Sequence, residues 1–171
     1  DGSLKVRGIE ARRRDTPPWI TRVQLQLLET LAQAPSAEDL PAYLPAARRS
    51  LSQALQELRR GRVPLPDLLV AQKLSHEIAA YQSPSPAARA AAQLQACGKI
   101  IRPGQRVRFL LTLGKPGVHA WDLPAQPDPR TVDVPRYAGM LQRAADTILA
   151  TIAGACAAST STLPPSENGL G

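Results

Sequence analysis

A chain of 171 residues is long enough for one domain with a hydrophobic core, or for one domain with an appendage. Its formal net charge of +7 favours a polyanionic partner, with nucleic acid ahead of a membrane surface, because the basic residues are spread along the chain and no lipidation motif is present. Aromatic residues make up 4% of the chain, which argues against a stacking platform for single-stranded nucleic acid.

The N-terminal segment is rich in arginine. Residues 4–10 alternate apolar and polar side chains, which predicts a strand, and Gly8 within it suggests a close approach of another backbone. Arginine donors match phosphate oxygens in pairs, so this segment is suited to holding phosphates. The first residue is Asp1, and we interpret the chain as a piece of a longer or processed polypeptide.

Helical patterns follow. Apolar residues at helical spacing predict a helix over 19–34, and Ser36 with acidic Glu38 and Asp39 predicts the capped start of a short helical piece. A longer helix is predicted from Leu44 to Arg60, with Gly61 as its C-cap. We interpret the arginines of this region mainly as a solvated helix face: Arg48, Arg49, Arg59, Arg60 and Arg62.

The pattern in the middle of the chain predicts a small region with both helix and strands. Residues 63–66 form a turn into 67–70, a short helix or extended run, and an alanine-rich helix is predicted over 87–97, closed by Gly98. After a tight turn at 102–104, alternation over 106–113 predicts a strand, with 118–123 as its partner. The inward face of that strand would hold Val107, Phe109, Leu111 and Leu113.

The last elements are a proline-rich connection over 124–135, a helix from about 135 to 155 and a tail. Leu141, Ala145, Ile148 and Ile152 would face the core. The tail, residues 157–171, is small and polar and is predicted to be disordered.

The sequence offers little for metal or nucleophilic chemistry. Cys97 and Cys156 are far apart and are interpreted as reduced, small apolar side chains. His76 and His119 are isolated from both cysteines and are interpreted as surface residues, so no zinc site is predicted.

Several motifs resemble family B DNA polymerases. Val6-Arg7-Gly8-Ile9-Glu10-x-x-Arg13-Arg14-Asp15 resembles the segment in which these enzymes leave the palm and enter the thumb. The run from Leu65 to Ser75, with Tyr81 after it, resembles the thumb element that contains Lys-x-Leu-Ser/Thr. Arg102-Pro103-Gly104 and Asp133-Val134-Pro135-Arg136-Tyr137 resemble later thumb motifs in the same order. The match departs at Ala87, where the family usually has His, and at Arg136, where it has Tyr.

The resemblance implies a mainly α fold with a small β element, an α+β class. It implies three parts: 1–18 as the last palm strand and the palm–thumb junction, 19–156 as the thumb, and 157–171 as the tail. Thumbs of this family grip primer–template duplex through its backbone and minor groove, and the basic composition agrees with such a partner. The expected function is therefore binding of duplex DNA in a DNA-directed DNA polymerase, in replication or repair.

The same resemblance assigns DNA-binding residues. Arg7 and Gly8 would lie near the primer strand, and Lys73 with Ser75 is the best thumb contact. For Arg12, Arg13 and Arg14, DNA contact and pairing with Glu10 or Asp15 both remain open, as do packing and phosphate contact for Tyr81. Arg102 would belong to a DNA-facing strip with Lys99, Arg106 and Arg108, although alternation alone already places Arg106 and Arg108 on the solvent side.

The resemblance also implies what this segment omits. The chain contains neither Asp-Thr-Asp nor Ser-Leu-Tyr-Pro-Ser, the motifs that hold the family's catalytic aspartates and metals. We therefore expect no polymerisation by this chain alone. Mg²⁺ is expected in the palm of the complete enzyme, with palm, fingers and exonuclease on the same or a partner chain. The expected location is the cytoplasm of a prokaryote, at the nucleoid. The tail lacks the aromatic anchor of a clamp-binding peptide.

Three other classes of protein have features that differ from those of this sequence. A helix-turn-helix protein needs a recognition helix rich in Arg, Asn or Gln, and the 87–97 helix is too rich in alanine. A stand-alone interaction or assembly subunit would have a large apolar patch and no salt-sensitive DNA binding. A hydrolase is poorly supported, because no Gly-x-Ser-x-Gly or glycine-rich phosphate loop is present.

Overall fold

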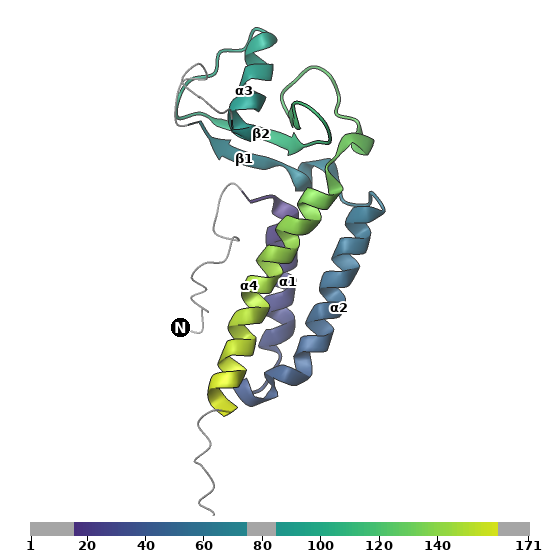
Figure 1. Ribbon diagram of the computed structural model, residues 1–171, viewed down its shortest axis with the longest axis vertical. Coiled ribbons are helices and arrows are strands. Elements are labelled where there is room, and N and C mark those ends of the chain that lie inside the picture. The colour runs from purple at the N-terminus through teal and green to yellow at the C-terminus, as the bar shows by residue number, and fades with distance from the viewer. Residues whose placement is uncertain (1–15, 75–84, 161–171) are drawn as a thin grey trace, which may run out of the picture.

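The computed structural model describes residues 16–74 and 85–160, and it has the α+β class that the sequence predicts. Three long helices lie side by side, and a small antiparallel sheet with a fourth helix sits at one end of them (Figure 1). The N-terminal segment that predicts a palm strand lies outside the described residues. None of the described helices combines the length and the apolar character that crossing a membrane requires.

The helical part consists of α1 (Pro18–Ala32), α2 (Leu40–Arg59) and α4 (Val134–Thr160). Each helix turns an apolar stripe inward, because apolar residues recur every three or four positions. The stripe of α1 includes Ile20 and Leu27, both fully buried, and α2 contributes Leu51 and Leu58. One polar side chain lies in this core: Gln24 is fully buried, and neither of its amide atoms has a hydrogen-bond partner.

Two local predictions in this part need correction. The second helix begins at Leu40 rather than Leu44, since Pro41 occupies the first turn, where backbone N–H groups have no helical partner anyway. Ser36 precedes a short 3-10 turn, η2 (Ala37–Asp39), but its hydroxyl donates to the Asp39 carboxylate at 2.8 Å instead of accepting from the backbone.

The sheet has the strand order β1-β2-β3, formed by β1 (Val70–Lys73), β2 (Arg106–Leu111) and β3 (Val118–Ala120). Helix α3 (Pro86–Ala96) packs on this sheet through small residues, among them Ala87 and Ala91. The Ser85 hydroxyl caps α3 by accepting from the Ala88 amide at 3.2 Å. Gln93 fastens the helix to β3, because its side-chain amide donates to the Val118 carbonyl and accepts from the Ala120 amide, both at 2.8 Å.

The second strand is shorter than predicted. It ends at Leu111, and Leu113, predicted as a core residue, is 55% exposed. Beyond Leu111 the chain leaves the regular ladder, because the Leu113 amide donates to the Thr131 carbonyl at 2.7 Å. Leu110, on the opposite side from the predicted inward face, is fully buried, so the end of this strand is covered on both faces.

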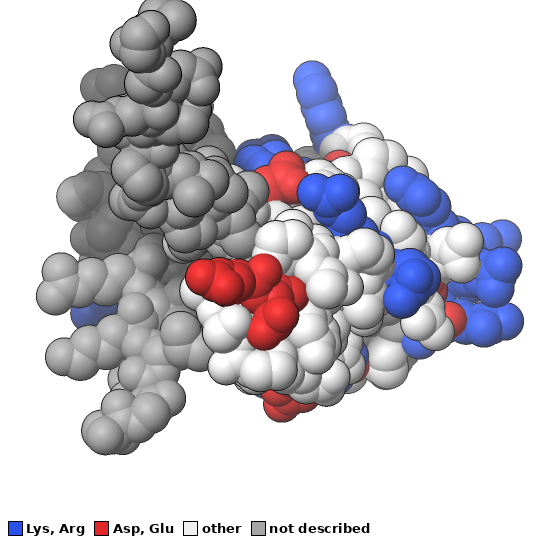
Figure 2. All heavy atoms as spheres, turned by 90° about the horizontal axis from the view of Figure 1, so that it is seen from below, with Lys and Arg blue, Asp and Glu red and all other residues white. Residues whose placement is uncertain are grey.

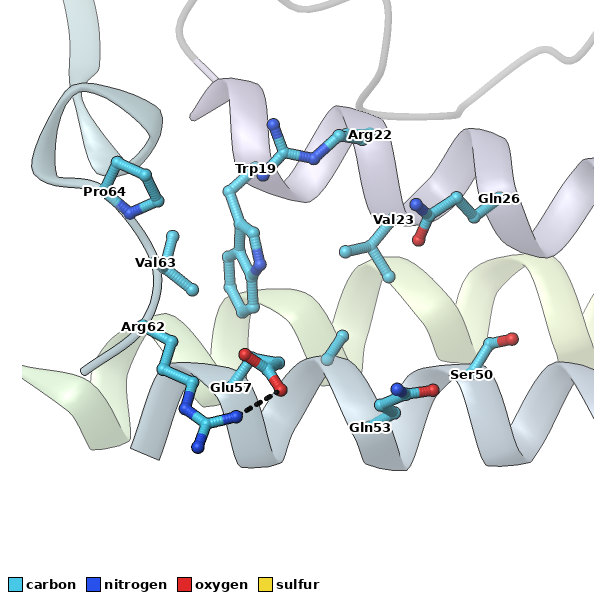
Figure 3. Close-up of a pocket in the computed structure, with 11 residues that line it drawn as sticks. Trp19, Arg22, Val23, Gln26, Ser50, Gln53, Glu57, Arg62, Val63 and Pro64 are labelled. Atoms are coloured by element: carbon cyan, nitrogen blue, oxygen red, sulfur yellow. Dashed lines mark ion pairs between the residues drawn. The ribbon is translucent and has the colours of Figure 1, made fainter. Parts of the chain in front are cut away.

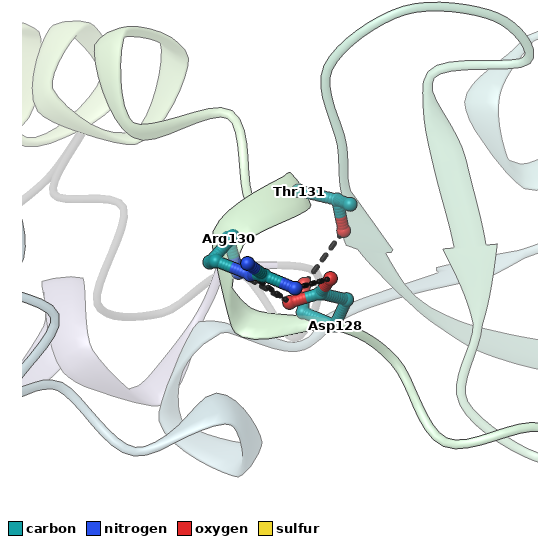
Figure 4. A network of polar contacts seen from close by, with 3 residues as sticks. All are labelled: Asp128, Arg130 and Thr131. Carbon is teal, nitrogen blue, oxygen red and sulfur yellow. Dashed lines mark hydrogen bonds and ion pairs between the residues drawn. The ribbon is translucent and has the colours of Figure 1, made fainter.

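The connection over 124–135 is held by its own polar contacts. It contains the 3-10 turn η5 (Pro129–Thr131), where the Asp128 carboxylate accepts from the Arg130 amide at 2.9 Å and from its guanidinium at 3.3 Å (Figure 4). These contacts, the backbone hydrogen bond first, lower the pKa of Asp128. The Thr131 hydroxyl donates to the Asp128 carbonyl at 2.7 Å.

Helix α4 joins the two parts of the molecule through Tyr137. This side chain is fully buried; its hydroxyl donates to the Leu68 carbonyl at 2.7 Å and accepts from the Leu111 amide at 3.0 Å. Leu68 ends the 3-10 turn η3 (Leu65–Leu68), and Leu111 ends β2. Burial raises the pKa of Tyr137 to about 12.

The last helix is longer than predicted. It continues to Thr160, four residues into the segment predicted as a disordered tail, because Ala157 and Ala158 extend the helix with residues of high propensity. The rest of that segment, 161–171, lies outside the described residues.

Replacing Tyr137 by Phe should lower the free energy of unfolding by about 2–4 kcal/mol, since each buried polar group left without a partner costs about 1–3 kcal/mol. Urea denaturation measures this. Tyr43→Phe is the matched control, because Tyr43 is only half-buried, and its change should stay within about 0.5 kcal/mol. Equal effects of the two variants would contradict the bridging role of the Tyr137 hydroxyl.

The stability of the chain should also fall at alkaline pH in a way that depends on Tyr137. The folded state keeps this phenol protonated up to a pKa of about 12, whereas the unfolded chain releases the proton near pH 10. The stabilisation is therefore complete below pH 10 and is lost as the pH rises toward 12. Urea titrations of the wild type and of Tyr137→Phe should converge over this window; a constant difference would count against the buried phenol.

Candidate nucleic-acid interface

The outer end of the sheet brings two cations face to face. Lys73, the last residue of β1, pairs with Arg106, the first residue of β2, and both side chains are exposed. Directly opposed residues of an antiparallel pair point to the same face with Cβ atoms about 5 Å apart, and like charges in this position are destabilising. The strand pairing therefore holds two positive charges together at a cost in stability.

A tight turn beside this pair adds a third cation. The Gly104 amide donates to the Leu74 carbonyl at 2.7 Å, and the Leu74 amide donates to the Gln105 carbonyl at 2.9 Å, so the turn is fastened to the end of β1. Gly104 has a φ of +88°, which suits glycine, and a Cβ there would lie 3.9 Å from Cε of Lys73. Arg102 opens the turn, and its amide donates to the Gln105 side chain at 2.6 Å.

One neighbouring cation is paired with a carboxylate, and another is hydrogen-bonded to the backbone. Arg108, one step further along the same face of β2, forms an ion pair with Asp122 at 3.2 Å, and Lys99 donates to the Asp122 carbonyl at 2.6 Å. Within the described residues, Lys73, Arg102 and Arg106 form no ion pair. We call these three residues the sheet-end cluster. Its positive charges are available to bind an external anion.

The structure thus brings together two of the residues that the sequence selected, Lys73 and Arg102. Arg106, which alternation alone left as a solvent-facing residue, proves to be the direct partner of Lys73; the strand register was the missing information. The other selected residues lie outside the described part of the chain: Arg7, Gly8, Arg12, Arg13, Arg14, Ser75 and Tyr81.

The two departures from the family pattern have clear structural settings. Ala87 lies in the first turn of α3, is 4% exposed and belongs to the hydrophobic core. Arg136 is exposed in the first turn of α4, where its amide donates to the Asp133 carboxylate at 3.2 Å. Tyr137 matches the second tyrosine of that motif, and its buried hydroxyl contacts both Leu68 and Leu111.

A groove between α1 and α2 also has charged residues in its lining. Its volume is about 340 Å³, and Trp19, Val23 and Ala54 form part of its lining (Figure 3). Its charged groups are paired with each other or with a neighbour: Arg62 contacts Glu57 at 3.6 Å, and Arg22 contacts Asp67 at 3.2 Å. The groove therefore has less charge to offer a ligand than the sheet end.

Groups suited to metal chemistry are sparse in the part of the chain that the structure covers. No cluster of three or more His, Cys, Asp or Glu side chains that could hold a metal is found among the described residues. His119 is hydrogen-bonded to the Ala125 carbonyl at 3.1 Å, and Cys97 is exposed at the end of α3.

Comparison with known proteins assigns the family. The profile of DNA polymerase family B matches residues 1–147, so the chain belongs to this family. It is 25% identical to DNA polymerase 1 of Sulfolobus acidocaldarius over 150 residues, which covers 87% of this chain and 17% of that protein. It is 25% identical to a DNA polymerase of Thermococcus aggregans over 114 residues, covering 67% of this chain and 6% of that protein.

The fold agrees with this assignment. The structure of the family B DNA polymerase from Pyrobaculum calidifontis matches 77% of this chain and 17% of that chain, with a TM-score of 0.64 and 20% sequence identity. The chain therefore spans less than a fifth of the length of these relatives.

Replacing Lys73 by Glu should stabilise the fold, because it turns a repulsive cross-strand pair into an attractive one. We expect a gain of about 0.5–1 kcal/mol in low salt that disappears in 1 M salt, where the Debye length is about 3 Å. Urea denaturation at the two salt concentrations measures it. Lys73→Gln, which only removes the repulsion, should give a smaller gain; destabilisation by both variants would contradict the charge opposition.

Proposed function

We propose that this chain is the thumb portion of a family B DNA polymerase and that it grips primer–template duplex through the phosphate backbone and minor groove. The observation that carries the proposal is the sheet-end cluster, in which the strand register opposes Lys73 and Arg106, and neither forms an ion pair with a carboxylate of the described residues. Bound phosphates would offset this repulsion. Binding an anion would therefore restore the stability that the opposed charges cost the fold.

The chemistry of the cluster suits a grip without sequence readout. A polymerase must hold every sequence equally, and contacts to phosphates carry no sequence information. Each phosphate neutralised by Lys or Arg releases condensed counterions, so affinity should fall steeply with salt. Three cations on a short sheet provide only a few such contacts, so the grip of this chain alone should be weak.

The proposal includes the rest of the polymerase. Palm, fingers and exonuclease would lie on the same polypeptide or on a partner chain, and Mg²⁺ would serve nucleotidyl transfer in that palm. This chain's own part would be to hold the duplex behind the reacting end. Membership of the family and the net charge of +7 support this division of labour.

The test is binding of the full chain to a labelled primer–template duplex across a salt series, with random-sequence single strand beside it. The wild type should prefer duplex, independently of sequence. Lys73→Gln combined with Arg106→Gln should reduce the slope of log affinity against log salt by about 2, since each phosphate contact contributes about 0.9.

The matched control removes two charges that are already paired with carboxylates, Arg22→Gln with Arg130→Gln. This variant should keep the wild-type slope. If the control and the sheet-end variant lose affinity equally, binding reflects net charge alone. If the wild type does not bind duplex in low salt, the autonomous grip is wrong, and a protein-interaction subunit becomes the better account.

A further inference from the structure

We propose that the outer face of α2 is a second duplex-binding surface, separate from the sheet-end cluster. Four arginines form it, and we call them the α2 arginines: Arg48, Arg49, Arg59 and Arg60. All four are exposed. This surface adds to the proposed function and does not depend on it, because the two surfaces share no residue.

The sequence spacing places the α2 arginines in two pairs on one side of the helix. Arg48 and Arg59 are eleven residues apart, and so are Arg49 and Arg60. Eleven residues are close to three helical turns, so the pairs point the same way and lie about 16 Å apart along the axis. Between them the exposed residues Ser52, Gln53 and Gln56 are uncharged, so no acidic side chain divides the surface.

Within the described residues, none of the α2 arginines forms an ion pair. Of the carboxylates close to them, Glu57 pairs with Arg62 at 3.6 Å. Asp146 shares a groove with Arg48 and accepts a hydrogen bond from the uncharged Gln142 amide at 2.9 Å. Viewed from below, most of the visible Lys and Arg side chains lie at the right, the side on which α2 lies in Figure 1, and the larger group of acidic side chains lies nearer the centre (Figure 2). Among the described residues, positive charge is therefore concentrated on this side of the molecule.

The surface fits nucleic acid better than protein. Protein interfaces have an apolar or aromatic centre, and interfaces with DNA are more polar and far more positive. Among the described residues the exposed large hydrophobic side chains are Leu25, Ile100 and Leu113, and none of them is on α2. Guanidinium groups also bind phosphate in a bidentate way, which a lysine cannot do.

The spacing of the two pairs also fits a duplex. The major groove is about 12 Å wide, so two arginine pairs about 16 Å apart can reach the phosphates on both of its sides. Helix α2 would then lie across the groove and contact only backbone. Strand β1 runs away from the α2 side and ends at Lys73, so the two cationic surfaces lie in different parts of the molecule (Figure 1). One chain should therefore hold two duplex segments at once.

The experiment uses the full chain and two 30-base-pair duplexes of random sequence, one with a donor dye and one with an acceptor. Energy transfer between them reports bridging by one chain, and sedimentation of the chain alone checks that it is monomeric. The wild type should bridge the duplexes at low salt. Arg48→Gln with Arg59→Gln should abolish bridging and reduce the salt slope of duplex binding by about 2.

Controls separate this proposal from the proposed function. Arg22→Gln with Arg130→Gln removes the same charge and should still bridge. If the sheet-end variant Lys73→Gln with Arg106→Gln keeps the wild-type affinity and salt slope, the sheet-end grip fails. The α2 surface is then judged by the salt slope, which its own variant should still reduce by about 2. If the α2 variant bridges like the wild type, the α2 surface is overturned whatever the sheet-end variant does.

A polyglutamate probe tests the acidic-protein alternative. If the α2 variant keeps its duplex affinity but loses polyglutamate binding at the same salt, the surface serves an acidic protein and the nucleic-acid proposal is wrong. Urea midpoints of the α2 variant and of the Arg22→Gln with Arg130→Gln control should match the wild type, because exposed substitutions of this kind change stability by about 0.5 kcal/mol or less.

Discussion

The buried hydroxyl of Tyr137 is the contact on which the arrangement of the two parts depends. It joins the end of η3 to the end of β2, and it comes from the helix that also runs the length of the helical part. Two directed hydrogen bonds in a dry interior fix both position and orientation, since any shift would leave a buried donor or acceptor without a partner. The sheet is thereby held at one end of the helices.

Cations that are paired with carboxylates and cations that are not lie in different parts of this fold, and this distribution points to a function. Several cations are neutralised where they stabilise the fold, as Arg108 is by Asp122 and Arg130 by Asp128. Others, at the sheet end and along α2, form no ion pair within the part of the chain that the structure describes. Exposed ion pairs contribute little to stability, so the fold loses little by omitting them, and the remaining charge is available for a polyanion.

Most elements could be predicted from the sequence, because apolar periodicity and the Gly and Pro punctuation are local signals. Gly98 follows α3 and closes it, as the sequence predicts, whereas the Ser85 cap was not predicted. The errors arise where tertiary contacts override the local pattern: Leu113 is drawn out of the strand by Thr131, and Tyr137 gains its role from two distant segments. The importance of Arg106 likewise depends on strand register, which alternation alone does not determine. The palm-edge arginines stay predictions, as they lie outside the described residues.

The most direct test of the duplex grip is an amide NMR titration of the full chain with a short blunt duplex in low salt. The account predicts that shift changes fall at residues 73–74 and 102–106, at the sheet end, together with 48–49 and 59–60 on the second surface, and that they disappear as salt is raised. Changes confined to the groove between α1 and α2, or spread evenly over every exposed arginine, would contradict it.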